Sequence, residues 1–169
     1  HIIQSNIMFF QQLSKLMVAL TELHQLMLDT LLKESDLPAS CSLADLRDNH
    51  RQRDQTAQKI LDLEKERQEL MTRFILDQQL KCDVRLKSLL HLCEPPLKKG
   101  LLSARKKILE LVEKIKTLAR KNAEKAITRI NCLNEVQGAV NKALKRQSLY
   151  NVKGRMDQPK GSCFVRKSI

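Results

Sequence analysis

The residues best suited to bind a metal ion are three cysteines and a histidine. Cys82, His91 and Cys93 are close in sequence, and Cys41 could supply a fourth ligand. Thiolate and imidazole groups are the ligands that tetrahedral zinc prefers, but structural zinc sites usually draw on CxxC-like pairs. The five cysteines of this chain form no such pair. We therefore expect ordinary, partly buried thiols, with no metal and no other cofactor.

Catalytic motifs are equally sparse. The four glycines, at positions 100, 138, 154 and 161, form neither a GxxxxGK[ST] nor a GxGxxG phosphate-binding loop. HExxH and GxSxG are also missing from the sequence. His24 and His50 fall on helical stripes without a neighbouring carboxylate and cysteine, so packing or exposure is their expected role. The sequence predicts a non-enzymatic protein with no catalytic residues.

The elements that would position any site are helices. Four glycines, four prolines and 3% aromatic residues in 169 positions are too few for an all-β or Rossmann-type fold. We predict an all-α fold, namely an elongated antiparallel helical bundle or coiled coil with one very long C-terminal helix and a short connecting helix. Its core should consist of Leu, Ile, Met and Val rather than aromatic rings. Residues 1–147 form the predicted helical domain, with helices at about 5–33, 43–80, 83–92 and 101–145, and residues 148–169 form a flexible basic tail.

Turn and capping residues set the predicted boundaries. Pro38 stops the first helix, and Ser42, three residues before Asp45, caps the second. The Pro95-Pro96 pair should end the short helix, with Gly100 closing a linker before the long one. Because His50, Arg53 and Arg67 fall on the apolar stripe of the second helix, its first half is expected to overhang the bundle and stay solvated.

The long helix carries an apolar stripe from Leu101 to about Lys145, with no proline and one glycine. At 1.5 Å per residue it would be roughly 65–70 Å long, against roughly 43 Å for the first helix. Its second half should therefore need cover from a client helix, from the second helix, or from another copy of the protein. The stripe there comprises Ile127, Ile130, Leu133, Val136, Val140 and Leu144, widened by Ala139 and Ala143.

The net charge of +12 is concentrated in the long helix and the tail. Residues 101–147 have 12 basic and 4 acidic residues, and residues 148–169 have 5 and 1. A solvated helix face, with basic residues at the rim that steer an acidic partner, accounts for this charge. Nucleic-acid binding is disfavoured because residues 101–147 contain no aromatic ring for stacking and no helix-turn-helix or zinc-finger spacing. A basic coiled-coil nucleic-acid-binding protein or a structural scaffold remains the alternative.

Cysteine usage and hydropathy indicate the cellular compartment of the protein. An odd number of cysteines without close pairs favours a reducing environment. No signal peptide is evident, and the longest apolar run, Leu16 to Leu20, is far too short to span a bilayer. We expect a cytoplasmic protein without a membrane span.

Three motifs suggest a known family. The second helix contains Leu63-Glu-Lys-Glu-Arg67-Gln-Glu-Leu70, an asparagine, Asn122, lies near the middle of the long helix, and Leu149-Tyr150 is followed by Gly154. In the order of its elements and in these motifs, the chain resembles the flagellar export chaperone family FlgN over about residues 13–154.

The resemblance implies a type III flagellar export chaperone. Such a protein binds the terminal amphipathic helix of hook-associated (hook–filament junction) proteins, prevents premature assembly, and delivers these proteins to the export gate. The implied client-binding residues are Ile127, Ile130, Leu133, Val136, Val140 and Leu144. Tyr150 is implied to dock on the cytoplasmic domain of the export-gate membrane protein. Self-association remains a second use for the stripe.

Overall fold

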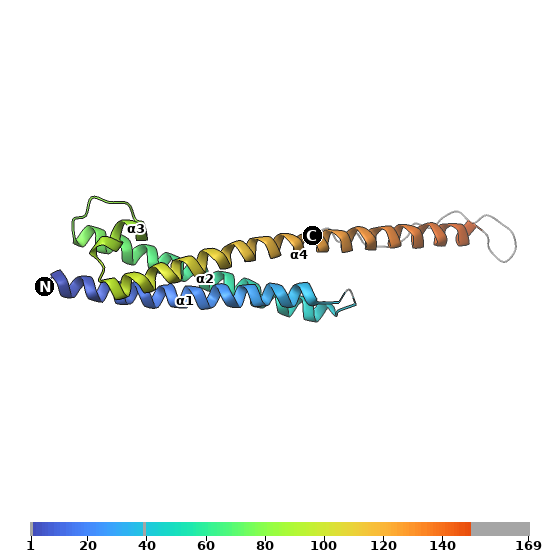
Figure 1. Cartoon of the computed structure of the whole chain (residues 1–169). Helices are drawn as coiled ribbons and strands as arrows, with labels where there is room; N and C mark the ends of the chain where they lie inside the picture. The colour runs from blue at the N-terminus through green and yellow to red at the C-terminus, as the bar shows by residue number, and fades with distance from the viewer. Residues whose placement is uncertain (1, 39, 150–169) are drawn as a thin grey trace. The chain divides into compact units, whose positions relative to one another are not determined.

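The computed structural model of the chain describes residues 2–38 and 40–149. Its elements, in chain order, are α1 (Ile2–Asp36), α2 (Leu43–Asp77), α3 (Leu86–Leu89), the 3-10 helix η1 (Leu90–Leu92) and α4 (Pro95–Leu149) (Figure 1). The predicted all-α fold with a long last helix and a short connecting helix is confirmed. The chain divides into a first unit, residues 1–123, and a second unit that begins at Glu124, and each is described by itself.

The core of the first unit begins where α1 and α2 pack in antiparallel orientation. Phe9, near the start of α1, stacks on Phe74, near the end of α2, with ring centroids 3.8 Å apart. Phe10 meets both rings edge-on. Aromatic rings therefore lie at the centre of this core, together with Leu, Met and Ile residues of the predicted kind. The buried residues around them include Leu13, Met17, Met71, Ile75, Leu86, Leu89 and Leu90.

The first part of α4 completes the core of this unit. Leu101 is fully buried in the same cluster as Phe10, and Leu97 and Ile108 pack against that cluster. Farther along, the Nδ2 of Asn122 donates a hydrogen bond to the carbonyl oxygen of Leu31 on α1, at 3.0 Å. Up to residue 123, α4 therefore runs parallel to α1, and this part of the chain is a three-helix assembly.

The helix boundaries follow from local chemistry, with one correction. Ser42 caps α2 as predicted, because its Oγ accepts a hydrogen bond from the backbone N–H of Asp45 at 3.1 Å. The long helix, however, begins at Pro95 rather than at residue 101, and Gly100 lies inside it. A proline in the first turn loses nothing, because the N–H groups there have no partner within the helix. The Pro-Pro pair therefore begins α4, and the linker predicted between this pair and Gly100 is helical.

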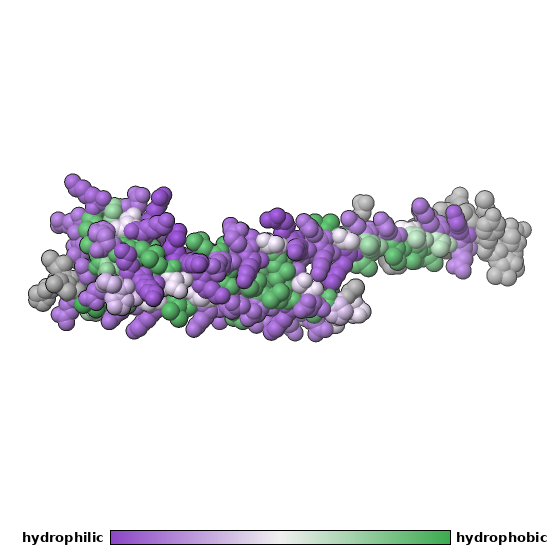
Figure 2. All heavy atoms as spheres, in the orientation of Figure 1, coloured by the Kyte–Doolittle hydropathy of each residue, from purple (hydrophilic) through white to green (hydrophobic). Residues whose placement is uncertain are grey.

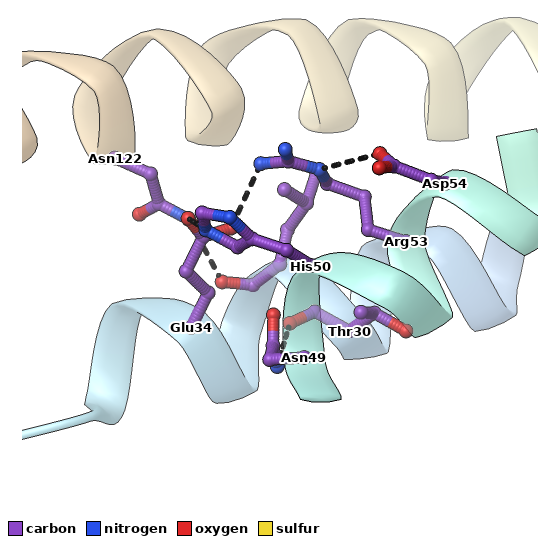
Figure 3. Close-up of polar contacts among 8 residues, drawn as sticks. Thr30, Glu34, Asn49, His50, Arg53, Asp54 and Asn122 are labelled. Atoms are coloured by element: carbon purple, nitrogen blue, oxygen red, sulfur yellow. Dashed lines mark hydrogen bonds and ion pairs between the residues drawn. The ribbon is translucent and has the colours of Figure 1, made fainter. Parts of the chain in front are cut away.

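The first half of α2 packs along the second half of α1, and the expectation that it overhangs the bundle was wrong. Asn49 donates to the carbonyl oxygen of Thr30, and His50 and Arg53 both contact the carboxylate of Glu34, at 3.1 and 3.4 Å (Figure 3). His50 and Arg53 are thus paired across the helix interface. They tolerate partial burial because the opposite helix supplies their partners.

Candidate client-binding surface on α4

The second unit, as far as the structure describes it, is the later part of α4. The six predicted client-binding residues all lie there, and their exposed fractions range from 49% for Leu144 to 68% for Leu133. Figure 2 shows apolar atoms along this part of the helix on the face in view. A row of exposed aliphatic side chains on one helix is a surface suited to another apolar helix face. We name it the α4 stripe: Ile127, Ile130, Leu133, Val136, Val140 and Leu144.

Helical geometry shows which members of the α4 stripe can act together. At about 100° per residue, Leu133, Val136, Val140 and Leu144 fall within about 80° of one another. Ile130 adjoins this group. Two successive steps of three residues displace Ile127 by about 120° from Leu133, which places it at the edge. Helical geometry therefore groups Leu133, Val136, Val140 and Leu144 on one narrow face, a distinction that the list of apolar positions did not make.

Cys132 is a residue of this region that sequence reasoning did not use. Its side chain is exposed and free, and it directly precedes Leu133. By the same helical geometry it borders the α4 stripe about 40° from Val136. It adds a chemically reactive probe at the edge of the surface.

Asn122 lies in the interface between α4 and α1, a position that its match to a family motif did not reveal. Only 7% of this residue is exposed, and its Nδ2 bonds to Leu31 as described above (Figure 3). Its Oδ1 is buried without a hydrogen-bond partner among the described residues. A polar residue on an apolar stripe usually fixes the register between helices at some cost in stability. Its place among Leu111, Leu118 and Ile115 in the sequence was the signal for this role.

The structure shows what surrounds the candidate metal ligands and His24. Among residues 2–38 and 40–149, no group of three or more His, Cys, Asp or Glu side chains could hold a metal ion. Burial raises the pKa of the Cys93 thiol above its usual value, and the nearby negative charge of Glu94 raises it further. That thiol therefore stays protonated at neutral pH and is a weak nucleophile. His24 is buried and its Nδ1 lies 2.7 Å from the carbonyl oxygen of Leu20.

Two further expectations concern the membrane and the export gate. No helix in the described part of the chain combines the length and the hydropathy that a bilayer span requires. Tyr150, the residue assigned to gate docking, lies outside the described residues.

Comparison with known proteins identifies the family. Residues 8–158 match the family FlgN, described as "FlgN protein". No curated protein and no solved structure gives a significant match. The family match covers nearly the whole chain, including most of α1 and all of α2, α3 and α4. The chain therefore belongs to the FlgN family of flagellar export chaperones for hook-associated proteins, which are not enzymes.

Proposed function

We propose that this chaperone binds the terminal amphipathic helix of a hook-associated protein along the α4 stripe. The client helix buries its apolar face there, which prevents premature assembly of the client until the chaperone delivers it to the export gate. Binding and delivery take place in the cytoplasm. The observation that carries this proposal is the exposure of all six aliphatic side chains of the α4 stripe.

The energetics support a helix as the bound element. Burying one Val, Leu or Ile side chain contributes about 1.5–3 kcal/mol, so a few such contacts outweigh the cost of ordering a client segment. The side chains recur at helical spacing, and only an apolar stripe of similar length can cover several of them together. Lys142 and Lys145 are exposed on the same stretch of α4 and lie beside the stripe in the sequence. They can steer an acidic client toward it.

The thiol of Cys132 offers a direct test of the proposed surface. In the free chaperone, a maleimide should modify exposed Cys132 several times faster than Cys93, whose pKa is raised by burial. Saturation with the hook-associated client should slow modification of Cys132 and leave the rate at Cys41 unchanged. Peptide-level mass spectrometry during the reaction measures each rate separately. Unaltered labelling of Cys132 in a saturated complex would place the client elsewhere.

Tyr150 provides the test for delivery to the gate. Family resemblance assigns this residue to docking on the cytoplasmic domain of the export-gate membrane protein. We expect Tyr150→Ala to leave client affinity within about twofold of wild type, because the α4 stripe is intact. Export of the hook-associated protein should fall sharply. Isothermal titration with the client, together with secretion into the culture medium, measures the two effects. Weakened client binding would move Tyr150 into the client site, and Tyr150→Phe tests whether the hydroxyl matters.

A further inference from the structure

A groove on the first unit combines apolar side chains with several cations. It has a volume of about 500 Å³ and is lined by residues of α1, α2, α3, α4 and the segment that leads into α3. This volume falls within the range of about 300–1,000 Å³ that is typical of ligand-binding clefts. Met17, Leu86 and Ile108 form its more buried apolar lining, and Val84 and Leu109 are exposed at 40% and 49%. All lining residues belong to residues 1–123.

The charges around this groove are strongly unbalanced. Arg67, Arg85, Lys87 and Arg105 line it, against a single acidic residue, Glu64. These five formal charges leave the groove with a net charge of +3. Cations beside exposed apolar side chains attract a ligand that carries carboxylates and aliphatic groups together.

Three of the four cations are available to a ligand. Arg67 is engaged, since its Nη2 lies 2.8 Å from a carboxylate oxygen of Glu64. Arg85 has only a long contact of 3.9 Å with Asp83, and both side chains are more than 70% exposed. Such a surface pair contributes little and is readily exchanged. Neither Lys87 nor Arg105 forms an ion pair within the described part of the chain.

We propose that this groove binds a short acidic segment of a partner protein, with carboxylates on Arg85, Lys87 and Arg105 and an aliphatic side chain on Ile108 and Leu109. This site is independent of the α4 stripe. The chain's own residues 148–169 carry five basic residues and one acidic residue, so their charge opposes entry. A second copy of the chain, at +12, is disfavoured for the same reason. A flat bilayer would not reach the buried Met17 and Leu86 that line the groove.

The charge half of the proposal is tested with the full chain and a fluorescein-labelled peptide that repeats Glu-Glu-Leu-Leu. Fluorescence anisotropy should show micromolar binding, which falls about tenfold or more in Lys87→Glu with Arg105→Glu. The matched control is Lys106→Glu with Lys107→Glu, which makes the same change of charge at exposed positions of α4 outside the groove. This control should weaken binding by less than about threefold.

The apolar contacts of the proposed site are tested with substitutions of two exposed leucines of α4. Leu109→Ser should weaken peptide binding severalfold, whereas Leu102→Ser, which is 40% exposed and lies outside the groove, should not. A peptide with Gln in place of Glu should bind the wild-type chain poorly. The variant Val136→Ser with Val140→Ser keeps the charge and should bind the acidic peptide normally, which separates this site from the α4 stripe.

Several results would overturn the proposal. One is an equal loss of peptide affinity in the two charge-reversal variants. Another is a loss of peptide binding in the Val136 and Val140 variant alone. The third is a wild-type chain that does not bind the peptide at all. Anionic phosphatidylglycerol vesicles are the last probe. If these vesicles bind in a manner that requires Lys87 and Arg105 while the peptide does not, the groove is a lipid site. Circular dichroism of every variant confirms that the helices persist.

Discussion

Val136→Asp combined with Val140→Asp is expected to reduce client affinity by more than about a hundredfold while the far-UV helical signal survives. Both side chains are at least half exposed in the free chain, so the substitutions remove no packing there. In the complex they would remove two aliphatic contacts worth about 1.5–3 kcal/mol each. They would also place two carboxylates against an apolar helix, and each factor of ten in affinity corresponds to about 1.4 kcal/mol. Isothermal titration with the hook-associated client measures the loss.

The same stretch of α4 offers a matched control. Asn131→Asp with Asn134→Asp adds the same charge at exposed positions that helical geometry places at least about 80° around the helix from Leu133, Val136, Val140 and Leu144. We expect this pair to change client affinity by less than about threefold. Equal losses in the two double variants would indicate that general charge repulsion, and not the stripe, controls binding. Undiminished affinity in the Val136 and Val140 variant would remove the stripe from the client site.

Self-association is the competing use of the α4 stripe, and the same variant distinguishes it. Sedimentation velocity at micromolar concentration gives the oligomeric state of the wild-type chain and of the variant. A wild-type dimer that becomes a monomer on substitution, with client affinity intact, would assign the stripe to a second copy. A monomer in both cases, with client binding lost, supports the proposed function.

Helical periodicity and capping made most of the fold predictable. The spacing of apolar residues predicted every long helix, because a 3.6-residue repeat is a local property of the sequence. Ser42 could be identified as a cap because a capping side chain bonds to a backbone N–H only three residues away. Pro95 misled the boundary prediction because proline disrupts a helix interior but is favourable in a first turn. Its effect depends on a start position that the periodicity does not give.

Contacts between helices were the part that could not be predicted. His50 and Arg53 were expected to remain in solvent. Their pairing was not predictable because their common partner, Glu34, lies on another helix and in another stretch of sequence. Helical spacing puts Phe9 and Phe74 on the apolar stripes of their helices, but only the antiparallel pairing of α1 and α2 brings the two rings together. The basic groove escaped notice for the same reason, since Arg67 and Arg105 lie on different helices and become neighbours only in the folded unit. For the candidate site, exposure of the α4 stripe agrees with the expectation that it needs an external cover, while client binding itself stays a prediction.

The aromatic cluster gives the largest expected effect on stability. Phe74 is 5% exposed, stacks on Phe9 at an interplanar angle of 6° and meets Phe10 edge-on, so Phe74→Ala would leave a cavity between α1 and α2. We expect the free energy of unfolding to fall by about 3–5 kcal/mol, and by only about 1 kcal/mol for Phe74→Leu, which fills most of the volume. Leu76→Ala, on the same helix but 70% exposed, should cost less than about 0.5 kcal/mol. Urea unfolding followed by circular dichroism at 222 nm measures all three variants. A cost for Phe74→Ala no greater than that for Leu76→Ala would show that the stacked rings do not hold the first unit together.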